Sequence, residues 1–422
     1  MPIYLLSKIQ MLNISISFNN RIFKSVKEAM EELGCQFREQ NHHSVLVWTD
    51  SIRDADYFSN LNPWQVINRI PCAHVLCRKA SLTRCIQQIA EFFPQLYNFY
   101  PKSYILPFKN SAFLRALKRK KCSWIIKPDS GSLGQGITIL NPGSEYPPDA
   151  SLSVAQEYVD SFLLDNTKFD LRIYALVTSV EPLTIYIYRD GLARFCSEVT
   201  GHHSVFSQIT NVTLNKQNPE LDKFEEISRL ISDTFPRLEK ECNADIKKLW
   251  GEIDNIIILS IMSAHRYLKT AVQRDCAPSI ISRCFQIFGF DILLDRELHP
   301  HVIEVNYRPN LEYHRGPERR MKVTMIRDAI AIAVPLESLQ AAVDVRPYGW
   351  DATSWKTFLL NNPTIINQIE QSRKKAIELS KYELIFPSTG DKQKIYQSVL
   401  NKIDQLKADV LPGTLISSEK DD

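Results

Sequence analysis

Two carboxylates stand among apolar residues where core side chains are expected. Asp291 lies in the stretch 288–294 and Glu304 in the stretch 301–305, and a polar, turn-like segment separates the two. If both stretches are strands of one antiparallel hairpin, Asp291 lies opposite Glu304, about 5 Å away at Cβ. Side chains alternate between the faces of a strand, so Asn306 points the same way as Glu304.

This arrangement predicts a site for a hard divalent cation. Two carboxylates this close and partly buried repel each other unless a positive charge lies between them. Carboxylate and amide oxygens are ligands for Mg²⁺, which takes few protein carboxylates and fills its remaining positions with water and substrate phosphates. We therefore interpret Asp291, Glu304 and Asn306 as Mg²⁺ ligands. The alternative is a solvated sheet face that carries two unrelated acids.

A glycine-containing hairpin is a candidate for binding phosphates. The stretch 123–140 has the pattern strand, loop, strand, and its loop holds Gly131, Gly134 and Gly136. Glycine allows positive φ and close approach of a ligand to the backbone. The loop lacks the Gly-Lys-Ser/Thr of a P-loop, and no helix follows it as in a dinucleotide fingerprint. A glycine hairpin that covers a nucleotide is the kinase-like arrangement. Lys127 ends the first strand; the alternative is a mobile tip with a solvated lysine.

A third candidate is a strand with a charged face. Lys168, Asp170 and Arg172 alternate with apolar residues, so the three charged side chains share one face. Arg194 follows the next strand. A solvated edge strand is the alternative explanation. Taken with the glycine hairpin and the carboxylate pair, this strand favours ATP with Mg²⁺ as the ligand.

The elements that position these residues are mixed in order. Strands are expected around 45–48, through 124–188 and at 288–305, and helices at 81–93, 221–235, 244–272 and 322–333, with two charged amphipathic helices at 364–382 and 393–410. Strands and helices in this order indicate an α+β fold with mixed or antiparallel sheets and flanking helices.

Bulk composition excludes several classes. The 422 residues carry a net charge of +3, too small to indicate a nucleic-acid partner. No apolar stretch is long enough for a membrane span. The nine cysteines show no CxxC pair and no zinc-ligand spacing, which favours free thiols in a reducing cytosol.

The ordered motifs resemble those of the tubulin–tyrosine ligase-like family. The stretches that carry the resemblance are WIIKPDSGSLGQGITIL, QEYV, KFDLRIYALVTS, YRDGLARF, QITNVTLNK and FGFDILLDRELHPHVIEVN, with NRIPCAHVLCRKASLTRCIQQIAEFFPQLYNFYPKSYILP before them. The match covers roughly residues 60 to 335.

The resemblance implies an ATP-grasp-type ligase and a role for individual residues. Catalytic roles would fall to Arg172 and Arg194. ATP would be bound by Lys127, Gly131, Gly134, Gly136, Gln156, Glu157, Tyr158, Val159, Lys168, Asp170, Thr210 and Asn211. The incoming amino acid would be held by Arg194 and Lys322, and Mg²⁺ by Asp291, Glu304 and Asn306. The implied domains are 1–107 (N-terminal α/β), 108–192 (central ATP-grasp), 193–345 (C-terminal ATP-grasp with the metal site) and 346–422 (a helical extension with a disordered tail).

Three departures from the family pattern bear on activity. The glycine loop of the family usually carries arginines, and here Leu133 and Gln135 stand in the stretch Ser-Leu-Gly-Gln-Gly. The family's Asn-Tyr-Ser is Asn211-Val212-Thr213 here. The segment after Asn306 reads Tyr-Arg-Pro-Asn, where Pro-Ser is commoner. The first departure puts turnover in question, and the other two indicate altered substrate choice.

The implied activity is ligation of an amino acid to carboxylates of tubulin tails through an acyl phosphate. Arg194 and Lys322 match positions associated with glutamate ligases, so glutamate is the first choice of donor, with glycine and tyrosine open. The rival hypotheses are a non-catalytic binder of tubulin and ATP, and an ATP-grasp ligase acting on a small molecule. The expected protein is a monomer at cytoplasmic microtubules, a cilium or a basal body, and the basic run 118–121 could steer an acidic tail.

Overall fold

The computed structural model describes the backbone of residues 12–16, 22–39, 44–50, 55–119, 121–130, 135–146, 150–201, 204–314, 316–344 and 350–406. The predicted glycines Gly131 and Gly134, with Leu133, lie outside these residues, as do 407–422 of the expected tail. Among the helices of the described part, none is both long enough and apolar enough to cross a membrane.

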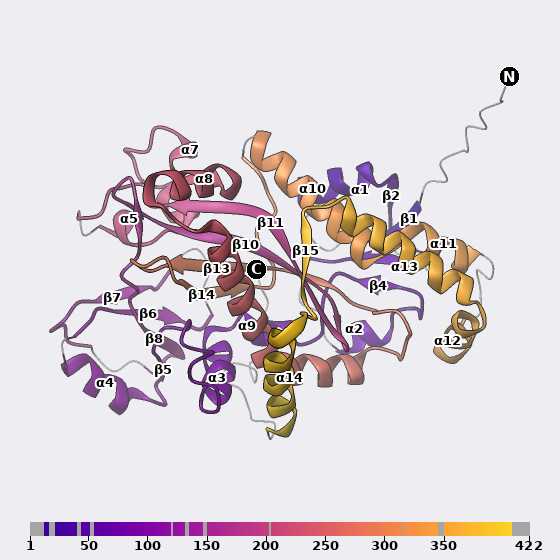
Figure 1. Ribbon diagram of the computed structural model, residues 1–422, viewed down its shortest axis with the longest axis horizontal. Coiled ribbons are helices and arrows are strands. Elements are labelled where there is room, and N and C mark those ends of the chain that lie inside the picture. The colour runs from indigo at the N-terminus through magenta and orange to yellow at the C-terminus, as the bar shows by residue number, and fades with distance from the viewer. Residues whose placement is uncertain are drawn as a thin grey trace.

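The long axis of the molecule has a different sheet at each end (Figure 1). At one end, four parallel strands run in the order β2-β1-β3-β4, with α1 and α2 beside them. Their bounds are β1 Leu12–Ile16, α1 Lys24–Glu32, β2 Cys35–Glu39, β3 Leu46–Trp48, α2 Ala55–Ser59 and β4 Val66–Ile67.

A four-stranded antiparallel sheet forms the other end and carries the described part of the glycine hairpin. Its order is β5-β8-β6-β7. The bounds here are the 3₁₀ turn Ala73–Leu76, α3 Lys79–Ala90, β5 Ser103–Leu106, α4 Asn110–Lys118, β6 Trp124–Pro128, β7 Thr138–Leu140 and β8 Ser153–Glu157. Phe113 of α4 and Trp124 of β6 pack edge to face in a small core of their own, with ring centroids 5.4 Å apart.

The central sheet connects the two ends and consists of antiparallel pairs. Its main path is β12-β11-β10-β13-β14, β15 pairs with the other part of β11, and β9 pairs with β10. The bounds are β9 Leu163–Leu164, β10 Thr167–Val180, β11 Leu183–Phe195, β12 Ser228–Leu230, β13 Gln286–Leu294, β14 Pro300–Asn306 and β15 Tyr382–Phe386. The predicted α+β class with mixed and antiparallel sheets is thus confirmed.

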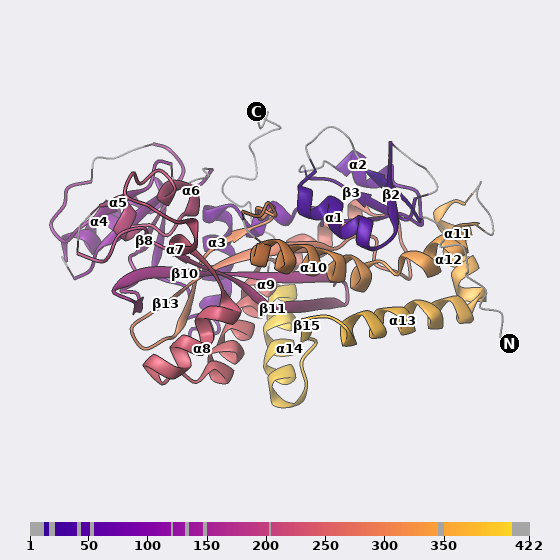
Figure 2. The same cartoon turned by 90° about the horizontal axis from the view of Figure 1, so that it is seen from above.

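Helices cover both faces of the central sheet. On one face, α9, α8, α3 and α14 share a core with Phe169, Leu171 and Ile173 of β10; on the other, α10 and α11 pack with Tyr174 and Leu176 of the same strand. Figure 2 shows α10 on one side of the β10–β11 ribbon and α8 and α14 on the other. The helices after β11 are α5 Val205–Gln208, α6 Val212–Asn215, α7 Phe224–Ile227, α8 Ile231–Cys242, α9 Ile246–Asp275, α10 Gly316–Ala333, α11 Leu336–Asp344, α12 Ala352–Asn361, α13 Pro363–Glu378 and α14 Gly390–Gln405.

One predicted helix is partly wrong. The apolar spacing of residues 221–235 favoured a continuous helix, but Ser228–Leu230 forms the short strand β12 between α7 and α8. The cause is tertiary, because these residues pair with the edge of β11 and strand pairing overrides a helical pattern. The helix predicted for 244–272 corresponds to α9, whose N-cap Asp245 accepts a hydrogen bond from the backbone N–H of Lys248 at 2.9 Å.

The predicted domain boundaries remain predictions. The boundary between 192 and 193 falls inside β11, which is a single strand of the continuous central sheet. The extension from 346 contributes β15 to that sheet and α14 to the packing against α9.

Candidate active site

A pocket of about 330 Å³ lies where the central sheet meets the small sheet. β6 and β8 form one wall, β10, β11, β13 and β14 form another, and α10 lies at one end. Of the predicted site residues that the structure describes, all line it except Gly136. Gly136 is the only one of the three predicted glycines that lies in the described part of the chain. Its φ is +70°, and a Cβ there would approach Pro128 Cγ to 2.9 Å, so this position requires glycine.

The predicted hairpin is confirmed, and so is its register. Asp291 of β13 pairs with Glu304 of β14, and a register shift follows directly after this pair. The turn between the strands contains Leu298 with a φ of +65°. The two acids therefore face one another as the alternation predicted, but each also meets a cation that the hairpin alone does not contain.

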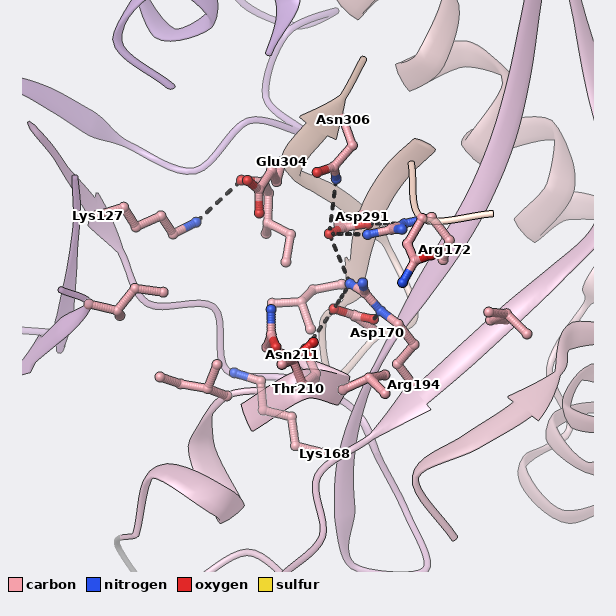
Figure 3. Close-up of a pocket in the computed structure, with 18 of the residues that line it drawn as sticks. Lys127, Lys168, Asp170, Arg172, Arg194, Thr210, Asn211, Asp291, Glu304 and Asn306 are labelled. Atoms are coloured by element: carbon pink, nitrogen blue, oxygen red, sulfur yellow. Dashed lines mark hydrogen bonds and ion pairs between the residues drawn. The ribbon is translucent and has the colours of Figure 1, made fainter. Parts of the chain in front are cut away.

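Two arginine–carboxylate pairs form an interlocked group at the base of the pocket (Figure 3). Arg172 Nε donates to Asp291 Oδ1 at 2.5 Å and Arg172 Nη2 to Asp291 Oδ2 at 3.0 Å. Arg194 donates to both oxygens of Asp170 at 2.6 Å and lies 2.9 Å from Asp291 Oδ2. Each pair is a cross-strand pair, since β10 places Asp170 opposite Arg194 of β11 and Arg172 opposite Asp291 of β13.

Burial and charge act in opposite directions on these acids. Burial raises the pKa of Asp291, but the guanidinium groups of Arg172 and Arg194 outweigh it and bring the pKa to about 2. Burial raises the pKa of Asp170 above its ordinary value, although Arg194 opposes it. Arg194 keeps its charge, because the two carboxylates raise its pKa against the effect of burial. The group is thus a fixed array of charges inside the protein.

The possible metal ligands lie on the same wall. Glu304 is 34% exposed in its side chain, and Lys79 Nζ lies 3.1 Å from its Oε1. The Nδ2 of Asn306 lies 3.4 Å from Asp291 Oδ2. An ionised carboxylate, a partly exposed carboxylate and an amide on one pocket wall are oxygen donors that fit a hard divalent cation.

Lys127 lies across the pocket from these acids. Its Nζ donates to Gln156 Oε1 at 2.7 Å and to the carbonyl of Ile303 at 3.3 Å, and Gln156 is held in turn by Ser103 Oγ at 3.0 Å. Figure 3 shows Lys127 pointing toward Glu304. Burial lowers the pKa of Lys127 to about 8, although Glu304 acts in the opposite direction.

Lys168 is the second buried ammonium group of the pocket. Its Nζ donates to the Tyr158 hydroxyl at 2.7 Å, and that hydroxyl donates to the carbonyl of Gln208 at 3.0 Å. Burial lowers the pKa of Lys168 to about 8. The alternative of a solvated edge strand is wrong, because β10 is an interior strand whose charged residues are almost fully buried.

The remaining predicted residues lie around this core. Gln156 and Glu157 end β8, and Tyr158 and Val159 follow it along the pocket wall. The Thr210 hydroxyl donates to Asp170 Oδ2 at 2.6 Å, which adds a hydrogen bond to the buried carboxylate. The Asn211 side chain caps α6, since its Oδ1 accepts from the backbone N–H of Leu214 at 3.1 Å.

Lys322 is held at the end of the pocket by three acceptors. Its Nζ lies 2.8 Å from Glu318 Oε1, one helical turn earlier in α10, and donates to the carbonyls of Asn310 at 3.1 Å and Glu312 at 2.5 Å. Both side chains are almost fully buried. Lys322 therefore joins α10 to the segment that follows β14.

The pocket residues that the sequence analysis missed include the charged side chains Lys79, Arg308 and Glu318. Lys79 is the first residue of α3 and belongs to a segment distant in sequence from β14. Its only sequence signal was the resemblance of the surrounding stretch to the family. Glu318 had a local signal, because it precedes Lys322 by four residues, the spacing at which helical side chains meet.

Comparison with known proteins identifies relatives of this chain. The sequence model described as the tubulin-tyrosine ligase family matches residues 58–341. The tubulin polyglutamylase ttll6 of Danio rerio is 33% identical over 330 residues, which are 75% of this chain and 42% of that protein. The tubulin polyglutamylases TTLL13 and TTLL11 of Mus musculus are 33% and 34% identical, covering 75% and 68% of this chain and 41% and 44% of their own lengths.

The chain spans about two fifths of the length of these relatives. The family match nevertheless covers well over half of this chain. It includes β6, β8, β10, β11, β13, β14 and α10, which carry the charged residues of the pocket, and it agrees with the predicted ATP-grasp-like fold. The chain belongs to the tubulin-tyrosine ligase family.

Proposed function

We propose that this chain is an ATP-dependent ligase that joins an amino acid, glutamate by first choice, to carboxylates in the acidic tails of tubulin. The relatives named as tubulin polyglutamylases support this activity. The observation that carries it is the pocket itself, in which Lys127 and Lys168 face a wall of oxygen donors that includes Asp291 and Glu304. We place the enzyme at microtubules, with a cilium or basal body as its more specific location.

The charges of the pocket suit a polyphosphate. Arg172 and Arg194 are neutralised by buried carboxylates, and Lys322 by Glu318. Lys168 instead donates to a neutral hydroxyl, and Lys79 and Lys127 share the neighbourhood of the single carboxylate of Glu304. These ammonium groups are available to phosphate oxygens, and the segment 156–159 along the pocket wall would border the base of the nucleotide.

Asp291, Glu304 and Asn306 would hold Mg²⁺ beside the phosphates. Bound there, the ion would neutralise charge on the phosphates during transfer. The low pKa of Asp291 supports this assignment, because a ligand carboxylate has to be ionised at neutral pH. The ion would then replace Lys79 as the partner of Glu304, and the Lys79 ammonium group would be able to contact a phosphate.

The reaction proceeds in two steps. First, an oxygen of the acceptor carboxylate attacks the γ-phosphorus of ATP, ADP leaves, and an acyl phosphate forms. Second, the amine of the free amino acid attacks the acyl carbon, phosphate leaves with the C–O electron pair, the nitrogen loses a proton, and an amide results. No nucleophile of the protein is required, so this chain contributes orientation and charge stabilisation.

Arg172 and Arg194 each retain hydrogen-bond donors that could bind the phosphoryl group or the carboxylate of the amino acid. Both use Nε and Nη2 for their carboxylate partners, and in the described residues no partner is found for either Nη1. Nη1 of Arg172 would stabilise the charge on the transferred group, and Nη1 of Arg194 would bind the carboxylate of the donor, with Lys322 beside it. A guanidinium held by a buried acid is oriented before the substrate arrives.

The test is transfer of label. Purified chain is incubated with ATP, Mg²⁺, microtubules and radiolabelled glutamate, glycine or tyrosine in separate reactions. The expected result is label in tubulin from glutamate alone. Label from glycine or tyrosine instead would show that this amino acid, and not glutamate, is the donor. The rival candidate is a non-catalytic binder, favoured by the absence of loop arginines at Leu133 and Gln135. Nucleotide binding without transfer of any label would select that candidate.

A further inference from the structure

Arg308 differs from the other cations of the pocket because the described residues offer its side chain no polar partner. It lines the pocket and is exposed, and the part of the chain that the structure describes offers it no hydrogen bond or ion pair. Every other cation of the pocket is bound to a neighbour. The pairs are Lys79 with Glu304, Lys127 with Gln156, Lys168 with Tyr158, Arg172 with Asp291, Arg194 with Asp170 and Lys322 with Glu318.

The backbone that carries Arg308 is fixed on both sides. The carbonyl of Tyr307 accepts from Gln286 Nε2 at 2.7 Å, and Lys322 Nζ donates to the carbonyl of Asn310. Pro309 packs so closely on Gly289 that a Cβ at Gly289 would lie 2.8 Å from Pro309 Cβ. An anion that binds Arg308 therefore has to order only the side chain, which limits the entropic cost of binding.

Arg308 also faces the N-terminal sheet. It lines a second, small cavity with Asp50, Asn68 and Arg69, which follow the carboxyl ends of β3 and β4. Asp50 and Arg69 pair with each other at 3.4 Å. Burial raises the pKa of Asp50, and the charges of Arg69 and Arg308 oppose that rise. The side chain of Arg308 thus stands at the boundary between the pocket and the N-terminal sheet.

We propose that Arg308 binds a carboxylate of the acidic acceptor peptide next to the residue that is modified. This inference rests on the proposed function and adds a specificity residue to it. An acceptor is a polymer whose flanking residues stay at the pocket rim while one side chain reaches inside, and Arg308 is an exposed pocket cation to which the described residues offer no polar partner. The free amino acid and the nucleotide are smaller and are served by the buried cations. A guanidinium matches a carboxylate through two parallel hydrogen bonds.

The experiment measures peptide binding and transfer separately. A fluorescent glutamate-rich peptide is titrated into the full chain with a non-hydrolysable ATP analogue and Mg²⁺, at low and at high ionic strength. For Arg308→Gln we expect the Kd of the peptide to rise about three- to fivefold at low salt, the range of a solvent-exposed ion pair, and the difference to shrink at high salt. In transfer assays the KM for the peptide rises by the same factor, while the KM for glutamate and the Kd of the nucleotide stay unchanged.

Two further variants make the result specific. Arg308→Lys keeps the charge and recovers most of the peptide affinity. Arg115→Gln removes one charge from the exposed surface of α4, outside the pocket, and controls for the change in net charge. Equal effects of Arg308→Gln and Arg115→Gln, no effect of either, or a selective rise in the KM for glutamate or in the nucleotide Kd would overturn the proposal. Peptide binding that depends on Arg308 without any transfer would support the proposal and reject ligation instead.

Discussion

Asp291 lies between two guanidinium groups, with Arg172 Nε 2.5 Å from its Oδ1 and Arg194 Nη2 2.9 Å from its Oδ2. The carboxylate that the hairpin pattern singled out as a metal ligand is therefore also the centre of a buried ion-pair group that joins β10, β11 and β13. One residue thus has two separable properties, its contribution to stability and its contribution to ligand binding.

Asp291→Asn is expected to destabilise the fold strongly. The substitution removes the charge that both guanidinium groups share, and loss of one partner from a buried pair costs about 3–5 kcal/mol. Denaturant unfolding measures the change in the free energy of unfolding. The control is Asp391→Asn, whose carboxylate is 93% exposed and pairs with Lys394 on α14. Destabilisation of similar size in both variants would contradict the role of the buried group.

Glu304→Gln is expected to separate binding from stability. Glu304 is one-third exposed and contacts Lys79, so its loss changes stability by less than about 1 kcal/mol. Transfer activity should disappear, because the amide lacks the negative charge that Mg²⁺ needs from this position. Calorimetric titration with Mg²⁺ and nucleotide should show weaker binding, with an unchanged midpoint of thermal unfolding. Full activity of this variant would remove Glu304 from the metal site.

Nucleotide affinity is expected to fall as the pH rises through about 8. Burial lowers the pKa of Lys127 and Lys168 to about 8, so both ammonium groups become neutral in the folded protein above that pH. The same shift acts on stability with the opposite sign. In the unfolded chain these lysines titrate near 10.5, so between about 8 and 10.5 the unfolded state binds more protons and their contribution to stability rises with pH.

Lys168→Arg provides the control for this pH dependence. Arginine stays charged across the whole range, so the fall in affinity should become shallower in the variant. Fluorescence titration of a nucleotide analogue from about pH 7 to about pH 9.5 measures the dissociation constant. An affinity of the unaltered protein that does not change over this range would show that neither lysine loses a proton there.

Residues beyond the family match are expected to contribute to the stability of the core. Phe386 of β15 is 4% exposed and belongs to the same core as β10 and α9. Phe386→Ala should lower the free energy of unfolding by about 3–5 kcal/mol. Leu384 of the same strand is 47% exposed, and Leu384→Ala should change stability by no more than about 0.5 kcal/mol. A small effect of both would indicate that β15 is peripheral.

The sequence predicted the contacts that local alternation determines. The pairing of Asp291 with Glu304 follows from a hairpin, whose register is set by its own turn. The cross-strand pairing of Arg172 with Asp291 could not be predicted in this way. The strands β10 and β13 are far apart in the chain, and the packing of both sheet faces sets their register. Lys79 reaches Glu304 from another part of the chain for the same reason.

The strand β15 pairs with residues Ile185 to Tyr188 of β11, although α9 and the β13–β14 hairpin lie between them in the chain. On the ribosome, this part of β11 is made long before its neighbour, so the strand edge of a nascent chain stays open until β15 at 382–386 has been made. Such edges recruit other chains. Production in the cell is therefore expected to depend on chaperones that shield β11 until translation passes residue 386.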